Sequence, residues 1–143
     1  MRDPFALDRF LAAQEPVFAT ALGELEAGRK ASHWMWFIFP QIEGLGSSPM
    51  ACRYAIASLD EARAYLAHPV LGPRLMRCVE ALLGHDGLTA RQIMGSPDDI
   101  KLRSSLTLFA RAAPGAVVFA EALERFFAGE ADPLTLAKVE RAD

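Results

Sequence analysis

Apolar residues recur along most of the chain every three or four positions, the spacing that places them on one face of an α-helix. Phe18, Leu22 and Leu25 fall at positions i, i+4 and i+7, and Gly28 then supplies a residue suited to the left-handed conformation that ends many helices. A helix over about residues 16–27 is therefore predicted. Comparable patterns predict helices at about residues 7–11, 58–67, 71–83, 89–95, 96–112 and 119–128, with a last one from residue 132.

Residues that cap helix ends occur where several of these helices are expected to begin. Ser58 with Glu61, and Thr89 with Gln92, have the spacing of a capping box, in which each side chain satisfies a free backbone donor of the first turn. The sequence Ser-Pro-Asp-Asp at 96–99 combines a cap, a proline at the first helical position and two carboxylates near the positive end of the helix dipole. We therefore expect an all-α fold, a compact bundle of about seven helices.

Residues 32–48, with the sequence SHWMWFIFPQIEGLGSS, depart from the helical pattern. Their aromatic and β-branched content favours a strand, but a lone strand cannot pair its backbone donors, and the other strand-like run, 117–119, lies inside a helical pattern. We expect instead a short helical turn and a long, ordered, aromatic-rich loop over residues 28–46. Ser48 and Pro49 then start the next helix.

Composition and charge are those of one globular domain. A chain of 143 residues with 52% apolar and 23% charged residues can bury a core, so residues 1–143 are predicted to form a single helical domain. The formal charge is -3 and basic residues are scattered among acidic ones, which argues against a nucleic-acid partner. The longest apolar run, 34–40, is too short to cross a bilayer, and no signal-peptide segment precedes it, so we expect a cytoplasmic protein without membrane contact.

Cysteine spacing and sequence motifs argue against common cofactor chemistry. Cys52 and Cys78 have no metal-binding or redox spacing and lie in apolar stretches, which predicts buried free thiols rather than a disulfide. The chain contains no Walker loop, no glycine fingerprint of dinucleotide binding, no nucleophile elbow and no zinc spacing. No cofactor and no metal are therefore expected.

Three long motifs carry a resemblance to a known family. They are GRKASHWMWFIFPQ at 28–41 with GLG at 44–46, YLAHPVLGPRL at 65–75, and DDIKLRSSLTLF at 98–109. These motifs resemble those of the bacterial and fungal family called domain of unknown function 1810. The resemblance implies a compact all-helical domain and carries over no catalytic residue. Some members bear the label calpastatin, but calpastatins are disordered polar inhibitors, a class that 52% apolar residues contradict.

The aromatic-rich segment also holds the side chains best suited to binding a small molecule. Trp34 and Trp36 offer flat faces on which a base or a sugar can stack, and Lys30, His33 and Gln41 place polar groups beside them. A structural role explains each of them equally simply. Large aromatic side chains are mostly core, a cation at a helix C-terminus is favoured by the helix dipole alone, and a histidine can be a satisfied core residue.

Polar residues crowd the helix expected from residue 96. Lys101 shares one side of this helix with Ser104 and Ser105, where a lysine can bind a phosphate or lower the pKa of a serine. Capping by Asp98 and Asp99, with burial of the hydroxyl groups against the helix backbone, explains the same residues without a functional role. The spacing by itself does not separate these two interpretations.

Our leading interpretation is a domain that binds a small polar or anionic ligand through the loop at 28–46. The first alternative is a metal-free hydrolase acting on a nucleotide or an ADP-ribose-like substrate, with His33 or Asp99 as acid or base and Lys101 or Arg74 holding an anion. The second alternative is a protein-interaction adaptor without a pocket. The identity of the ligand and the oligomeric state stay open at this stage.

Overall fold

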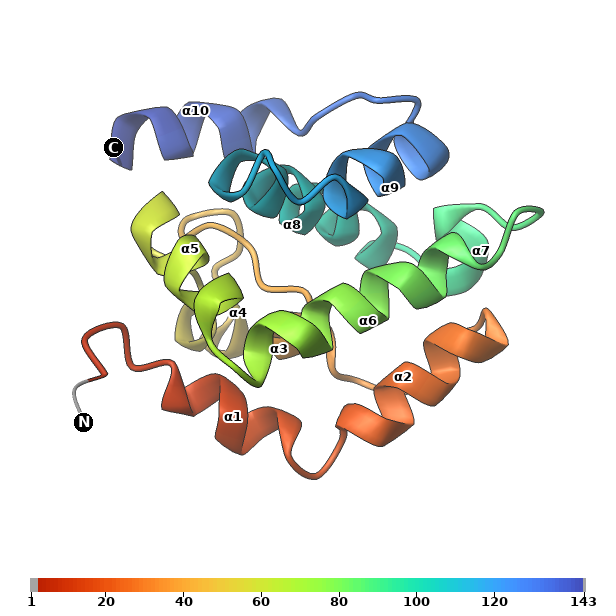
Figure 1. Ribbon diagram of the computed structural model, residues 1–143, viewed down its shortest axis with the longest axis horizontal. Coiled ribbons are helices and arrows are strands. Elements are labelled where there is room, and N and C mark those ends of the chain that lie inside the picture. Colours follow the sequence, from red (N-terminus) through yellow and green to blue (C-terminus); the bar gives the residue numbers. More distant parts are fainter. Residues whose placement is uncertain (1–2, 143) are drawn as a thin grey trace.

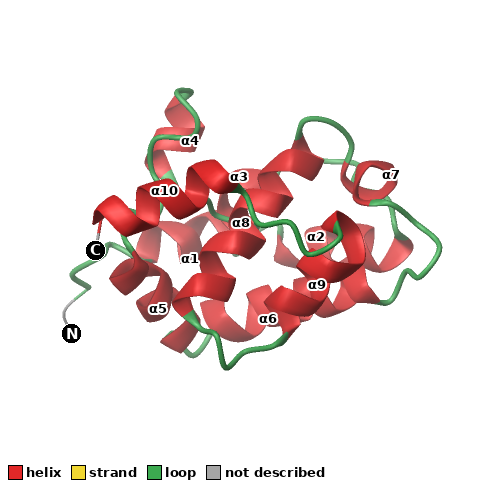
Figure 2. Cartoon of the chain, turned by 90° about the horizontal axis from the view of Figure 1, so that it is seen from above, coloured by secondary structure: helices red, strands yellow, loops and turns green. Residues whose placement is uncertain are grey.

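A computed structural model describes residues 3–142 of the chain. This part of the chain contains ten α-helices. Their bounds are α1 Asp8–Gln14, α2 Phe18–Ala27, α3 Met35–Ile38, α4 Pro49–Arg53, α5 Leu59–Ala67, α6 Leu71–Leu83, α7 Ala90–Met94, α8 Asp98–Ala112, α9 Val118–Phe127 and α10 Pro133–Ala142. Figure 1 shows α8, α9 and α10 along the upper side of the molecule, α6 across its middle, and α1 and α2 along the lower side. Figure 2 shows the same all-helical architecture from above.

Helix α8 lies at the centre of this arrangement. It packs against α5, α7, α9 and α10. Leu102 and Phe109 are fully buried, and the polar residues Ser104 and Thr107 on other sides of the same helix are buried as well. A helix that is enclosed on most sides must find partners for its polar side chains inside the protein.

The described residues form ten helices, where the sequence led us to expect about seven. Helices α3, α4 and α7 have only four or five residues, and such short helices are the hardest to count from a repeating apolar pattern. Two of them do begin at the caps seen in the sequence, because Ser48 accepts a hydrogen bond from the N–H of Ala51 and Thr89 forms its capping box with Gln92. The longest of the ten helices is α8, with 15 residues. No helix in the described part of the chain is long and apolar enough to cross a membrane.

The stretch between α2 and α5 is the least regular part of the fold. Helix α3 is a short helical turn of the kind expected in the aromatic-rich segment, and it divides residues 28–46 so that they do not form one long loop. A parallel bridge pairs Ile42 with Ile56, in which the N–H of Ile56 donates to the carbonyl of Gln41 and the N–H of Glu43 donates to the carbonyl of Ile56, both at 2.8 Å. This bridge fixes the loop after α3 against the connection that leads into α5.

The two cysteines differ in their surroundings. Cys78 on α6 is buried as expected, and burial raises the pKa of its thiol to about 12. Cys52 is exposed, so the expectation of burial is wrong for this residue. The reason is that α4, a single short turn, buries none of its residues.

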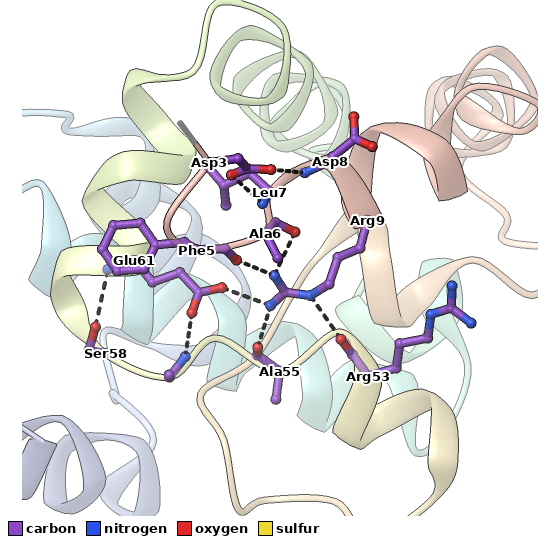
Figure 3. Close-up of polar contacts among 11 residues, drawn as sticks. Asp3, Phe5, Ala6, Leu7, Asp8, Arg9, Arg53, Ala55, Ser58 and Glu61 are labelled. Carbon is purple, nitrogen blue, oxygen red and sulfur yellow. Dashed lines mark hydrogen bonds and ion pairs between the residues drawn. The ribbon is translucent and has the colours of Figure 1, made fainter. Parts of the chain in front are cut away.

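The guanidinium group of Arg9 ties α1 to the connection between α4 and α5 (Figure 3). Its Nε donates to the carbonyl of Arg53 at 2.9 Å, and one terminal nitrogen donates to the carbonyl of Ala55 and the carboxylate of Glu61, both at 2.8 Å. The other terminal nitrogen donates to two carbonyls of its own N-terminal turn. All five donors of the group are used, and the buried carboxylate of Glu61 gains a counter-charge.

Helix α6 begins in close contact with the end of α5. A Cβ atom built on Gly72 would lie 2.1 Å from the carbonyl oxygen of Leu66 and 2.9 Å from its carbonyl carbon. Because backbone atoms cannot swing aside as a flexible side chain can, only glycine fits at this position. Gly23, in the middle of α2, differs because no atom lies within 4 Å of its Cβ position apart from its chain neighbours and the backbone of its own helix.

A pair of glycine substitutions tests this close approach. Gly72→Ala should lower the free energy of unfolding by about 3 kcal/mol, because the two helices must separate to admit the methyl group. Gly23→Ala should raise it by about 0.5–1 kcal/mol, since alanine is the better helix former and nothing obstructs it. Urea denaturation measures both values. Equal stability of the two variants would show that α5 and α6 are not in close contact here.

Replacing Arg9 by Lys tests the anchoring of the connection between α4 and α5. The lysine can keep an ion pair with Glu61 but cannot reach the carbonyls of Arg53 and Ala55 at the same time, so we expect a loss of about 2–3 kcal/mol in the free energy of unfolding. Amide hydrogen exchange at residues 51–57 should accelerate as well. Arg111→Lys is the matched control, because Arg111 is exposed and pairs with no described residue.

Candidate functional site

Helix α2 carries the carboxylate that shapes the start of the aromatic-rich segment. Glu24 accepts hydrogen bonds from the backbone N–H groups of Ala31 at 2.8 Å and Ser32 at 3.0 Å, from the Ser32 hydroxyl at 2.6 Å, and from the indole N–H of Trp34 at 2.9 Å. Burial raises the pKa of this carboxyl group, but the hydrogen bonds outweigh burial and lower the pKa from 4.5 to about 2. Trp34 is only 1% exposed and belongs to the core.

Lys30 is also committed to structural contacts. Its Nζ donates to the carbonyl of Ser32 at 2.6 Å, forms an ion pair of 2.9 Å with Asp98 at the start of α8, and lies 4.9 Å from the centroid of the Trp34 ring. The side chain is 8% exposed. Lys30 and Trp34 were both expected as ligand contacts. In the structure Lys30 joins the aromatic-rich segment to α8, and Trp34 joins it to α2.

A pocket of about 470 Å³ lies between the loop after α3 and helices α8 and α10. Three of the expected site residues line it together: Trp36 of α3, Gln41 of the following loop, and Lys101 of α8. The Lys101 Nζ lies 5.9 Å from the centroid of the Trp36 ring. Two motifs that are far apart in the sequence thus contribute to one concave surface, which we call the α8 lobe.

A second pocket of about 340 Å³ adjoins the α8 lobe. Cys52 of α4 and the loop residues Glu43 and Gly44 line this second pocket, which we call the α4 lobe. The residues common to both lobes are Trp36, Gln41, Leu45, Gly46 and Ala51. The two lobes therefore share a wall.

The ammonium group of Lys101 has unused hydrogen-bond donors. It lies 3.7 Å from one oxygen of Asp98, too far for a hydrogen bond, while Lys30 takes the other oxygen at 2.9 Å. Within residues 3–142 the Lys101 Nζ donates no hydrogen bond, and its side chain is 34% exposed. A partly buried cation with free donors at a pocket wall is suited to binding an anionic group.

An acidic residue that the sequence did not single out also lines the α8 lobe. Asp132 is 8% exposed, and its Oδ2 accepts hydrogen bonds from the Ser104 hydroxyl at 3.2 Å, the Thr135 N–H at 3.0 Å and the Thr135 hydroxyl at 2.5 Å. In the sequence, Asp132 followed by Pro133 indicates only the start of a helix. Its place beside Ser104 arises from the packing of α10 on α8, which no local pattern reveals.

The remaining expected residues lie away from both lobes. His33 is exposed and pairs with no other described residue. Arg74, near the start of α6, reaches the end of α1, where it donates to Gln14 and Glu15 at 3.4 Å. Asp99 lines neither lobe, and its buried Oδ1 has no hydrogen-bond partner among the described residues. Proximity in the sequence to Lys30 or Lys101 therefore does not bring His33 or Asp99 into the pocket.

Comparison with known proteins identifies the family. A family model described as "Protein of unknown function (DUF1810)" matches residues 4–139. The chain belongs to this family. It is similar to the crystal structure of the conserved hypothetical protein Rv1873 from Mycobacterium tuberculosis, with a TM-score of 0.95 and 51% identity over 96% of this chain and 99% of that one. A search among curated proteins finds no match.

The Glu24→Gln variant tests how the aromatic-rich segment is held in this DUF1810 protein. Loss of the charge should lower the free energy of unfolding by about 1–3 kcal/mol at neutral pH. Because the folded-state pKa of about 2 lies below 4.5, this stabilisation is present above pH 4.5 and is lost as the pH falls toward 2. Urea denaturation at neutral and acidic pH should therefore show the two proteins converging, and a gap independent of pH would contradict the assignment.

Proposed function

We propose that this protein binds a small anionic molecule with a flat or apolar part in the α8 lobe. The observation that carries the proposal is the convergence of Trp36, Gln41 and Lys101 on one pocket of about 470 Å³. This volume is in the range of small-molecule sites. Trp36 supplies an aromatic face, Gln41 an amide that can donate and accept, and Lys101 a positive charge.

The charges and the rim of the α8 lobe support an anionic ligand of this kind. Lys101 keeps free donors, whereas the negative charge of Asp132 is compensated by the three hydrogen bonds that its Oδ2 accepts. Ile100 and Leu134 line the same lobe although they are 60% and 63% exposed. Exposed apolar side chains around a pocket are suited to covering an apolar part of a ligand.

The family motifs also support this location. Of the three motifs that carry the resemblance to the family, the one at 28–41 supplies Trp36 and Gln41, and the one at 98–109 supplies Lys101 and Ser104. Residues from two motifs therefore line the same lobe. The motif at 65–75 lines neither lobe and includes Gly72, which the contact between α5 and α6 requires.

The arrangement favours binding over hydrolysis. His33 and Asp99, the acid or base candidates, lie outside both lobes. Ser104 donates its hydroxyl hydrogen to an Asp132 oxygen that already accepts two other hydrogen bonds. Within residues 3–142, no histidine lines the α8 lobe beside this serine to act as its general base.

A thermal-shift screen with nucleotides, sugar phosphates and carboxylates tests the proposal. A ligand at 100 times its dissociation constant should add about 2.7 kcal/mol to the free energy of unfolding. The same ligand should change the tryptophan fluorescence of the protein through Trp36, which lines the lobe. Trp34 should not respond, because it is buried and bonded to Glu24. Loss of that response in Trp36→Phe would assign it to the pocket, and a library without any hit would count against the proposal.

Substitution of Lys101 separates binding in the pocket from general attraction to a charged surface. Lys101→Gln should weaken a bound anion by about tenfold, because a charge-assisted hydrogen bond is lost. Arg111→Gln is the matched control, since it removes the same charge from an exposed position near the other end of α8. Equal weakening by both variants would contradict a specific contact with Lys101.

A further inference from the structure

All three lysines of the protein lie near the α8 lobe or the α4 lobe. The chain has 15 Lys and Arg residues, and only Lys30, Lys101 and Lys138 are lysines. Lys30 and Lys101 flank Asp98, and Lys138 of α10 reaches Gly44 in the wall of the α4 lobe. No arginine whose side chain the structure describes lines either lobe. Because a lysine ammonium is a compact charge while a guanidinium is a wide, planar fork, this distribution indicates a site that uses compact cations.

Lys138 lies against Gly44, which lines the α4 lobe, although Lys138 is not itself among the residues that line either lobe. Gly44 has a φ of +95°, and a Cβ atom built on it would lie 2.7 Å from the Lys138 Nζ and 3.3 Å from its Cε. The ammonium end of Lys138 therefore occupies the space that a side chain at position 44 would fill. Lys138 lies one turn after Leu134, which lines the α8 lobe, so both residues share one face of α10.

The ammonium group of Lys138 has no counter-ion among the described residues, and it donates no hydrogen bond to them. Its side chain is nevertheless partly buried. Glu43 lies next to Gly44, but it is exposed and does not form an ion pair with Lys138. Lys101 and Lys138 therefore share a property that Lys30 lacks: each holds a charge near a lobe without a hydrogen-bond acceptor.

We propose that Lys138 is a second ligand-binding residue, and that the ligand carries two anionic groups, carboxylates or phosphates. Lys101 binds one group in the α8 lobe and Lys138 binds the other beside Gly44 at the α4 lobe. Trp36 and Gln41 line both lobes, so the middle of such a ligand lies across them. This inference rests on the function proposed above and adds the second cation and the second anionic group.

The small number of lysines makes a direct test possible. In protein labelled with ¹³C-lysine, the Cε signals of the three side chains can be assigned from single Lys→Arg variants and followed by NMR during titration. Acetate and fructose 6-phosphate are probes with one anionic group, and adipate and fructose 1,6-bisphosphate are the corresponding probes with two. Acetate and adipate test carboxylates, and the two fructose phosphates test phosphates.

We expect one of the probes with two anionic groups to shift the signals of Lys101 and Lys138 together. It should bind about tenfold more tightly than the corresponding probe with one anionic group, because the second contact forms within the complex. Lys30 is an internal control, because its ammonium group already contacts Ser32 and Asp98 and its signal should stay in place. If Lys101 responds and Lys138 does not, the inference is overturned while the proposed function stands.

The Lys138→Gln variant gives an independent measurement. It should reduce the affinity for the probe with two anionic groups to within about twofold of the affinity for the probe with one. The affinity of Lys101 for the probe with one anionic group should stay unchanged. Arg111→Gln should alter neither affinity, and thermal denaturation should show that Lys138→Gln remains folded. If Lys138→Gln still binds the probe with two anionic groups about tenfold more tightly than the probe with one, the role of Lys138 is refuted. If no probe shifts either lysine, the proposed function and the inference fall together.

Discussion

The stretch between α2 and α5 contains only two short helices, so many of its backbone groups must find hydrogen-bond partners outside regular structure. Buried or partly buried side chains of neighbouring helices supply these partners. Glu24 accepts from two N–H groups at the start of the stretch, Gln14 donates to the carbonyl of Phe37 at 2.7 Å, and Arg9 donates to two carbonyls near its end. Because this stretch forms most of the wall of both lobes, the shape of the candidate site depends on these bonds.

Neighbouring residues of the same type take opposite roles in this protein. Trp34 is sealed in the core by its bond to Glu24, whereas Trp36, two positions later, forms a wall shared by both lobes. Lys30 and Lys101 both approach Asp98, but only Lys30 is saturated by close partners. The difference lies in the number of partners within reach, and this number depends on how the elements pack.

Helix α8 connects the core to the candidate site. One side of it contributes Leu102 and Phe109 to the core, and another contributes Lys101 and Ser104 to the α8 lobe. A ligand held by this helix and by α3 would join two segments whose positions depend on tertiary contacts. Binding would therefore add directly to the stability of the folded state.

The sequence by itself determined that the protein is all-helical, where most of the longer helices lie, and which family it belongs to, because apolar period, capping residues and motifs are local properties of the chain. It also singled out Trp36, Gln41 and Lys101. Only the tertiary structure decided that these three share a pocket, that Asp132 joins them, and that Lys30 and Trp34 do not. The physical reason is that burial and convergence arise where α3, α8 and α10 meet, and no local pattern records which distant segments will pack together.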